Sequence, residues 1–220
     1  MSAVIVPRQR RKEARPQELL DAAAALFIEK GFAATRSEEV AARAGVSKGT
    51  LYRYYPSKDD LFKAVVRENL SAPIAESAAL AAQYQGPIAT LLREMMRAWW
   101  ERVGEGIMDG VTKIMLVEAR NFPELAQFYA EEVIEPSQAL LGSLLERGMR
   151  SGEFRDVPVE AGVHLLIAPL MQLMLHQHSF GDICNPNMSA AELLEAQMSL
   201  LLHGLLVEPT PSAAGVARRP

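Results

Sequence analysis

The stretch Ala41-Ala-Arg-Ala-Gly-Val-Ser-Lys-Gly-Thr-Leu-Tyr-Arg-Tyr-Tyr-Pro-Ser-Lys58 decides the fold of the N-terminal part of this chain. It predicts the end of one short helix, a glycine turn, a second short helix and the capped start of a third. Gly45 can adopt the positive φ that a sharp turn between helices requires. Ser47 can cap the second helix through its side-chain oxygen. This order of elements is that of a helix-turn-helix.

The first turn after Ser47 carries Lys48, Gly49 and Thr50, which are a cation, a residue with almost no side chain and a hydroxyl. Such residues let a helix approach another surface closely, as a recognition helix approaches bases in the DNA major groove. Tyr52 could pack inward or face the same surface. We therefore expect this segment to bind DNA.

Four segments of the chain carry a resemblance to a known family. They are Gly31–Thr35, Val40-Ala41, Ala44–Tyr52 and Ser57–Phe62. Together they resemble the N-terminal domain of TetR/AcrR-type transcriptional regulators, over roughly residues 17 to 66. The resemblance implies an all-α fold of about nine helices. Three would form a helix-turn-helix DNA-binding domain, and the others a larger helical domain for ligand binding and dimerisation.

Two positions at the start of the motif depart from the usual family pattern. Arg36 stands where the family mostly has a small hydroxyl residue, and Ser37 where it mostly has an apolar one. The resemblance also implies phosphate contacts from Tyr54 and from Lys58, the latter beside a helix N-terminus that itself favours anions. The candidate DNA-binding residues are Thr35, Arg36, Ser47, Lys48, Gly49, Thr50, Tyr52, Tyr54 and Lys58.

Apolar periodicity, caps and helix breakers predict helices throughout and no strand. The second helix could be capped by Thr35 with Glu38, or by Ser37 instead. The expected helices cover about residues 16–30, 35–44, 46–55, 57–80, 87–102, 110–121, 123–151 with an interruption near Pro136, 158–180 and 189–207.

Charge divides the chain into a basic front and an acidic back. Residues 1–70 hold 13 Lys and Arg against 9 Asp and Glu, whereas the rest of the 220 residues hold 10 against 18. Only the front therefore suits a polyanion. We divide the chain into a basic arm (1–15), a DNA-binding domain (16–63, motif about 36–55), a ligand-binding and dimerisation domain (64–208) and a disordered tail (209–220). The arm is either a solvated tail or a segment that follows DNA phosphates or enters the minor groove.

Composition favours a folded soluble protein, since 49% of the residues are hydrophobic. A single cysteine, Cys184, excludes an intrachain disulfide and fits a reducing cytoplasm. The apolar segment before Pro7 is too short for a signal peptide. The longest apolar run, residues 163–175, is interrupted by Pro169 and is shorter than a bilayer-spanning helix. We expect a cytoplasmic protein with no membrane role.

Methionines and aromatic residues gather on the helices expected in the middle of the back domain. Core packing accounts for most of them, but ten methionines also suit a pocket that accepts variable apolar ligands. The resemblance implies such a pocket for an effector in the corresponding helices. The candidate lining residues are Met95, Trp99, Met115, Phe128 and His164.

The last two expected helices are apolar on more than one side, so something must bury them. The resemblance implies that they pack against the same pair of a second copy, in a four-helix dimer interface. Burial within one protomer is the alternative. The candidate interface residues are Leu166, Leu170, Leu173, Met174, Leu194, Leu201 and Leu205. Pro169 predicts a kink in the first of these helices.

No pattern of catalytic or metal-binding residues is evident in the chain. His176 and His178 are two residues apart on one helix and point to different sides, and no carboxylate or thiol cluster completes a site. We expect no cofactor, no metal and no enzymatic activity.

The function that we infer is that of a ligand-responsive transcriptional regulator. It would bind a palindromic operator as a homodimer, most simply as a repressor, and would be released by a small apolar effector. The first alternative is a DNA-binding protein whose C-terminal domain binds a protein partner instead of a ligand. The second, a helical enzyme with a DNA-binding head, lacks a catalytic constellation.

Overall fold

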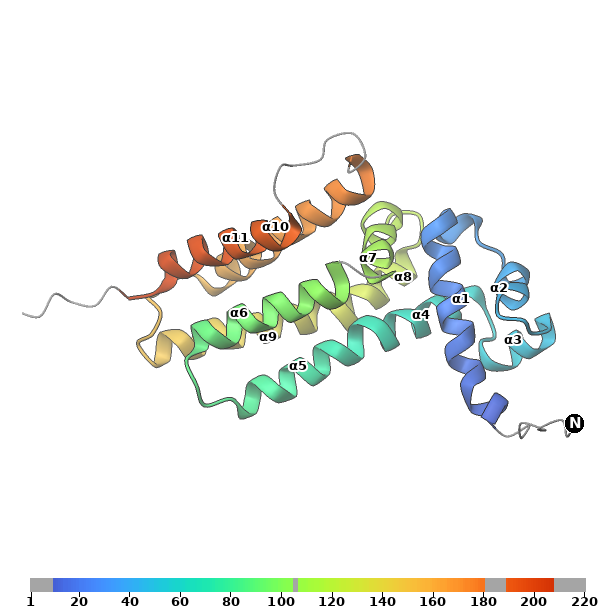
Figure 1. Ribbon diagram of the computed structural model, residues 1–220, viewed down its shortest axis with the longest axis horizontal. Coiled ribbons are helices and arrows are strands. Elements are labelled where there is room, and N and C mark those ends of the chain that lie inside the picture. Colours follow the sequence, from blue (N-terminus) through green and yellow to red (C-terminus); the bar gives the residue numbers. More distant parts are fainter. Residues whose placement is uncertain (1–9, 105–106, 181–188, 208–220) are drawn as a thin grey trace, which may run out of the picture.

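The computed structural model describes residues 10–104, 107–180 and 189–207, and within these ranges every regular element is helical (Figure 1). The helices are α1 (Arg10–Ala34), α2 (Ser37–Arg43), α3 (Lys48–Tyr54), α4 (Lys58–Val66), α5 (Ala72–Gln83), α6 (Ile88–Trp99), α7 (Ile107–Glu118), α8 (Pro123–Tyr129), α9 (Glu135–Arg150), α10 (Val159–Phe180) and α11 (Ala190–Leu205). The expected all-α fold is confirmed. Cys184 and the expected tail after residue 208 lie outside the described residues.

Three short π-helical segments join some of these helices into longer rods. They are η1 (Arg67–Ser71), between α4 and α5, η2 (Trp100–Gly104), after α6, and η3 (Ala130–Ile134), between α8 and α9. Counted as continuous rods, the described helices number nine, as the sequence predicts. The expected interruption before Pro136 is η3, and a π turn there accommodates a residue that has no N–H to donate.

The N-terminal helices and the start of α4 form a small head at one end of the molecule, and α5 to α11 form a longer body beside it (Figure 1). Helix α1 begins at Arg10, six residues before the expected start at Pro16, since Arg, Lys, Glu and Ala all favour helix. The segment expected as a basic arm therefore becomes helical from residue 10, while residues 1–9 lie outside the described ranges. At Gly31 (φ 81°) the helix kinks, where the sequence predicts its end.

Head and body meet along two contacts between helices. Helix α1 packs on α7, so closely that a Cβ on Gly110 would lie 2.6 Å from Cγ1 of Ile28. Helix α4 packs on α8, and Lys63 of α4 stands over the ring of Phe128 together with Arg67, the first residue of η1. The sequence indicates only the rod that starts at Ser57 as the connection between the two parts. The α1–α7 contact is a second one.

The end of the body far from the head is fastened by polar bonds between elements distant in sequence. The guanidinium of Arg147 donates to the last carbonyls of α5, at Ala81 and Tyr84. The carboxylate of Glu153 accepts from the first backbone N–H groups of α6, at Ile88 (2.7 Å) and Ala89 (2.8 Å). Each bond satisfies a backbone group that a helix end leaves open, so these helices are held in register at that end.

Helix α10 is longer than the apolar run that the sequence indicates. It continues for 22 residues, and its segment Val159–His176 is long and apolar enough to cross a membrane, although only 28% of that segment is buried. Packing against α7, α9 and α11 makes α10 part of the helical body. The prediction that this helix is too short to span a bilayer is therefore wrong, and its contacts with α7, α9 and α11 place it in the body instead.

Candidate nucleic-acid interface

Local capping sets the geometry of α2 and α3. Arg36, not Thr35 or Ser37, is the N-cap of α2, and its backbone N–H donates to the carboxylate of Glu39 (3.3 Å). Ser47 caps α3 as predicted, since its Oγ accepts from the backbone N–H of Thr50 (3.1 Å). Between the two helices Gly45 adopts φ 66°. The turn that the sequence predicts is therefore built as expected, while the start of α2 is not.

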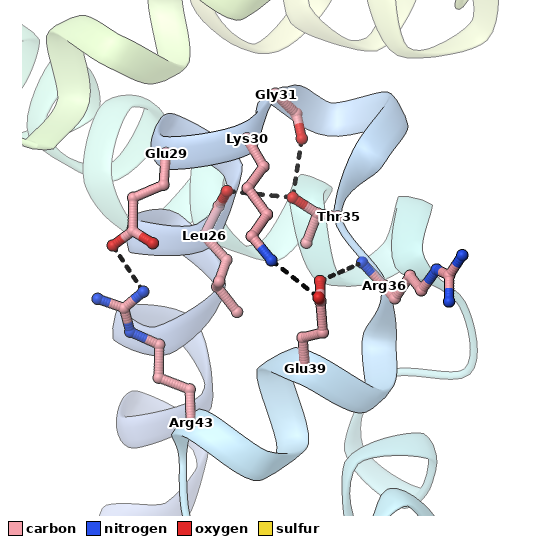
Figure 2. A network of polar contacts seen from close by, with 8 residues as sticks. All are labelled: Leu26, Glu29, Lys30, Gly31, Thr35, Arg36, Glu39 and Arg43. Carbon is pink, nitrogen blue, oxygen red and sulfur yellow. Dashed lines mark hydrogen bonds and ion pairs between the residues drawn. The ribbon is translucent and has the colours of Figure 1, made fainter.

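Two ion pairs fasten α2 onto α1, as Figure 2 shows. Lys30 donates to Glu39 at 2.8 Å, and Arg43 donates to Glu29 at 2.6 Å. The hydrogen bond from Lys30 is the main reason that the pKa of the Glu39 carboxyl lies below its ordinary value. These contacts hold the helix that positions α3.

Thr35 belongs to this scaffold and not to its outer surface. Its side chain is 1% exposed, and its hydroxyl lies 2.8 Å from the carbonyl oxygen of Gly31 and 3.1 Å from that of Leu26 (Figure 2). The hydroxyl therefore satisfies carbonyls at the end of α1, and cannot reach a duplex without unfolding the turn. We remove Thr35 from the candidate DNA contacts. The guanidinium of Arg36 points away from the network in Figure 2 and stays among them.

The first turn of α3 presents a polar, open face. Lys48 and Gly49 are exposed, Thr50 is partly exposed, and Tyr52 is 38% exposed. A Cβ added to Gly49 would meet only the Oγ of Ser47, at 3.9 Å, so the fold itself does not demand glycine there. Glycine lowers the surface at this point of the face, which lets a partner approach the backbone.

Lys48 is engaged by a carboxylate of the preceding helix, which the sequence does not indicate. Its ammonium forms an ion pair with Glu38 on α2 and lies 5.6 Å from the centre of the Tyr52 ring. The hydrogen bond with Lys48 lowers the pKa of Glu38, and the same bond raises the pKa of Lys48. Ten residues separate the two, so no local spacing rule reveals the pair.

Lys58 does not extend into solvent as the resemblance implies. Its Nζ donates to three carbonyl oxygens near the end of α1, those of Phe32 (2.8 Å), Ala33 (3.1 Å) and Thr35 (3.1 Å). The ammonium also stands 4.5 Å from the centre of the Phe32 ring. An ammonium has three protons to donate, and here all three have acceptors. Lys58 therefore ties the start of α4 to the end of α1, and we do not place it on a phosphate. Tyr54 is half-buried against the core.

The candidate effector residues fall into three groups in the structure. Met115 and Phe128 are buried in the interior of the body, on α7 and α8. Met95 and Trp99, on α6, are partly buried against the same core. His164 is exposed and lies along a surface groove of α10 instead, next to Ile167 and Ala168. We therefore remove His164 from the interior set.

The candidate dimer residues mostly face the core of their own protomer. Six of the seven are no more than 8% exposed, so they offer almost no surface to a second copy; these are Leu166, Leu170, Leu173, Met174, Leu194 and Leu205. Leu201 is partly buried. The outer faces of α10 and α11 carry other apolar residues, among them Leu165 (59% exposed) and Leu200 (76% exposed). The apolar pattern predicts both helices, but the residues proposed for the dimer interface lie mostly on the faces that turn toward the core of the same protomer.

A capped helix-turn-helix with an open polar first turn, mounted on a helical body, defines a DNA-binding transcriptional regulator. Two family descriptions match the chain and together cover more than half of it. Residues 19–65 match "Bacterial regulatory proteins, tetR family", and residues 82–183 match "Tetracyclin repressor-like, C-terminal domain". The chain belongs to the TetR family of transcriptional regulators, and as such it is not an enzyme.

Individual relatives agree with this assignment. The chain is 28% identical to the regulator YdeS of Bacillus subtilis, over 75% of this chain and 80% of that protein. It is 29% identical to the transcriptional repressor KstR2 of Rhodococcus jostii, over 70% of this chain and 76% of that one. Among solved structures, FadR of Bacillus subtilis in complex with stearoyl-CoA has a TM-score of 0.70, covering 86% of this chain and 98% of FadR at 19% identity. That likeness concerns the fold.

Proposed function

We propose that this regulator is a repressor that binds a palindromic operator as a homodimer and is released from it by a small apolar molecule. The open first turn of α3 carries the proposal. Lys48, Gly49 and Thr50 present a cation, a residue without a side chain and a hydroxyl on α3, which Ser47 caps. Two ion pairs hold the preceding helix, α2, against α1. Such a helix can enter the major groove with its backbone close to the bases.

The proposal of a homodimer is supported by exposed apolar residues on the outer faces of α10 and α11. Leu165, Leu175 and Leu200 are at least 38% exposed there. Leu175 also lines a groove of about 760 Å³, whose other described walls likewise come from α10 and are His164, Ile167, Ala168, Met171, Gln172 and His176. A second copy of the same two helices would cover this apolar surface. A two-fold dimer also carries two copies of α3, which fits a palindromic operator.

The proposal of an apolar effector is supported by two structural neighbours and by the apolar interior of the body. One structural neighbour is the transcriptional regulator FadR of Bacillus subtilis in complex with stearoyl-CoA, and another is the ketosteroid transcriptional regulator KstR2 of Mycobacterium tuberculosis. The candidate residues Met95, Trp99, Met115 and Phe128 are all apolar or aromatic and belong to the core or pack against it. An apolar molecule is the ligand that such an interior can accept.

Coupling between effector and operator follows from the joint between head and body. Helices α7 and α8 carry Met115 and Phe128 and also contact the head through α1 and α4. A ligand that prefers a different arrangement of α7 and α8 shifts the head, and the spacing of the two α3 helices changes with it. Effector and operator then weaken each other by the same factor.

The test measures binding to operator DNA from the upstream region of the regulator's own gene, by fluorescence anisotropy at several salt concentrations. Lys48→Ala should weaken binding and, if Lys48 neutralises a phosphate, should reduce the salt slope by about 0.9. Lys63→Ala is the matched control, because it removes the same charge from α4, where Lys63 stands over Phe128. Gly49→Ala should weaken binding about tenfold or more while the protein stays folded.

Three outcomes of this experiment would contradict parts of the proposal. If no duplex binds more tightly than random DNA, the operator-binding function fails. If Lys48→Ala and Lys63→Ala have equal effects, α3 is not the contact surface. If stearoyl-CoA, free fatty acids and steroid ketones all leave operator binding unchanged, the effector part fails, and a protein partner for the body becomes the better hypothesis.

A further inference from the structure

Two buried polar atoms stand out in the body because they have no hydrogen-bond partner. Within the described residues they are the indole Nε1 of Trp100 and the Oγ of Ser71. Trp100 is 1% exposed and is among the largest fully buried side chains. A buried donor without an acceptor is unfavourable, and such groups are rare in folded proteins. The Trp100 N–H therefore needs an explanation.

Both atoms belong to π-helical segments. Trp100 is the first residue of η2, and Ser71 is the last residue of η1. π-helical turns interrupt regular helix geometry at some cost and are frequent at functional sites. Segment η2 packs against α7, and η1 packs against η3. Segment η2 thus contacts α7, which carries Met115, and η1 contacts the segment that directly follows α8, which carries Phe128.

The composition of the buried interior limits the chemistry of an acceptor for Trp100. Among residues whose exposure the structure describes, no Lys, Arg or His is buried, and Thr35, Ser37 and Thr112 are the buried polar ones. Thr112 on α7 already accepts from the hydroxyl of Tyr129 on α8 (3.1 Å). A carboxylate or phosphate at this depth would lack a counter-charge. A neutral oxygen would not need one.

We propose that the Trp100 N–H is the hydrogen-bond donor of the effector site, and that it selects apolar effectors with a neutral carbonyl oxygen, such as ketones, esters or thioesters. This inference rests on the proposed effector response and specifies its chemistry. A ketone or thioester brings an acceptor without charge, and its hydrocarbon part fits the apolar interior. An otherwise identical hydrocarbon leaves the indole N–H unpaired and binds less tightly.

The site also reaches the DNA-binding head in one step. Helix α7, against which η2 packs, carries Gly110 and Glu118. A Cβ on Gly31 of α1 would lie 3.4 Å from Glu118 Oε1, and a Cβ on Gly110 would collide with Ile28 of α1. A hydrogen bond formed at Trp100 on η2 therefore acts on α7, against which η2 packs. Helix α7 is in close contact with α1 of the head, so a shift of α7 would displace α1.

The experiment uses matched pairs of probes on the full chain without DNA. The pairs are 2-undecanone with undecane, and androstan-3-one with androstane, and binding is followed by intrinsic fluorescence. Trp99 and Trp100 are the two tryptophans of the chain, so the emission reports this region directly. We expect each ketone to bind about tenfold more tightly than its hydrocarbon, and Trp100→Phe to abolish that difference.

A second measurement does not depend on a variant that replaces a buried residue. The ¹H–¹⁵N spectrum of the wild-type protein contains two indole signals, and Trp99→Phe identifies the one from Trp100. A ketone should move the Trp100 N–H proton downfield, and its hydrocarbon should not.

The proposal is overturned if neither ketone binds, if ketone and hydrocarbon bind equally, or if Trp100→Phe weakens both members of a pair alike. Because binding is measured without DNA, the proposed effector response can fail separately. A ketone that bonds to Trp100 but leaves operator affinity unchanged supports the hydrogen bond and contradicts only that response.

Discussion

The head and the body of this regulator are built by different kinds of contact. In the head, short helices are fixed by caps, by a positive-φ glycine and by ion pairs such as Lys30 with Glu39. In the body, long apolar helices pack side by side, and π segments interrupt three of the rods. The geometry of the head is therefore set by local contacts. The proposed effector response requires a change of packing in the body, not in the head.

The joint between them combines both kinds of contact. Phe27, Phe32 and Phe62 form a cluster inside the head with ring centres 5.1 to 5.5 Å apart. Phe122, just before α8, adds a fourth ring from the body, 4.8 Å from that of Phe32. An edge-to-face aromatic pair of this kind contributes about 0.5–1.5 kcal/mol beyond the area it buries. A shift of α8 should therefore be passed on to the head.

The largest expected effect comes from removing one ring of this cluster, that of Phe62. Phe62→Ala should destabilise the protein by about 3–5 kcal/mol, because Phe62 is fully buried and the head is too small to collapse around the cavity. Urea unfolding monitored by circular dichroism measures the change. Leu144→Ala, fully buried in the body, is the comparison. If Phe62→Ala costs less than Leu144→Ala, the head is more adaptable than the body and the contrast fails.

Lys58→Met should destabilise the protein by about 2 kcal/mol, since three backbone carbonyls lose their charged donor while the aliphatic stem is largely kept. The salt slope of operator binding should stay unchanged, because in this structure Lys58 caps α1. Lys63→Met is the control for loss of charge on the same helix. A slope reduced by about 0.9 in Lys58→Met alone would return Lys58 to the phosphate contacts.

Gly110→Ala tests the joint itself. The added methyl group collides with Ile28, which costs about 1–3 kcal/mol, and better helix propensity offsets up to about 1 kcal/mol of that. We expect a net loss near 1 kcal/mol and an altered response of operator affinity to the effector. Ile28→Ala should rescue Gly110→Ala in a double-mutant cycle. Purely additive effects would mean that the two helices do not press on each other.

The smallest effect concerns acid stability of the head. The pKa of Glu39 lies below its ordinary value of 4.5, mainly through the hydrogen bond from Lys30. The stabilisation from this bond is therefore present above that ordinary value, and is lost as pH falls through the lowered pKa. Glu39→Gln should be slightly less stable than the wild type at neutral pH, and the gap should close in acid. Parallel pH titrations of unfolding measure it. A constant gap would exclude the ion pair as its cause.

The sequence predicted the head better than the body for a physical reason. Caps and turns depend on residues three to five apart, so Gly45 and Ser47 could be assigned their roles directly. Which face of an apolar helix turns inward depends on partners far along the chain, so Leu166 and Leu170 were placed on a dimer surface although they are buried in the protomer. Lys58 shows the same limit inside the head, because its acceptors lie at least 23 residues away.

The unpaired Trp100 N–H has no sequence signature at all. The gathering of methionines and aromatic residues, with the family resemblance, indicates Trp99 as a candidate for the effector pocket, while its neighbour carries the buried donor. A π-helical turn at this point changes the angle at which each following side chain leaves the rod. A helical projection drawn from the sequence therefore assigns the wrong direction to side chains after this turn. The sequence predicts which residue types the interior contains, but not which of them face one another.

The ion pair between Glu38 and Lys48 bears on how such a protein finds one site among many. A lysine with a carboxylate already beside it gains less from meeting a random phosphate, because that contact must first break the pair. Non-specific DNA affinity depends on charge alone, whereas a matching operator adds contacts that repay the exchange. Under the proposed operator binding, Glu38 would therefore weaken non-specific binding more than specific binding. The ratio between operator affinity and affinity for the rest of the genome would widen.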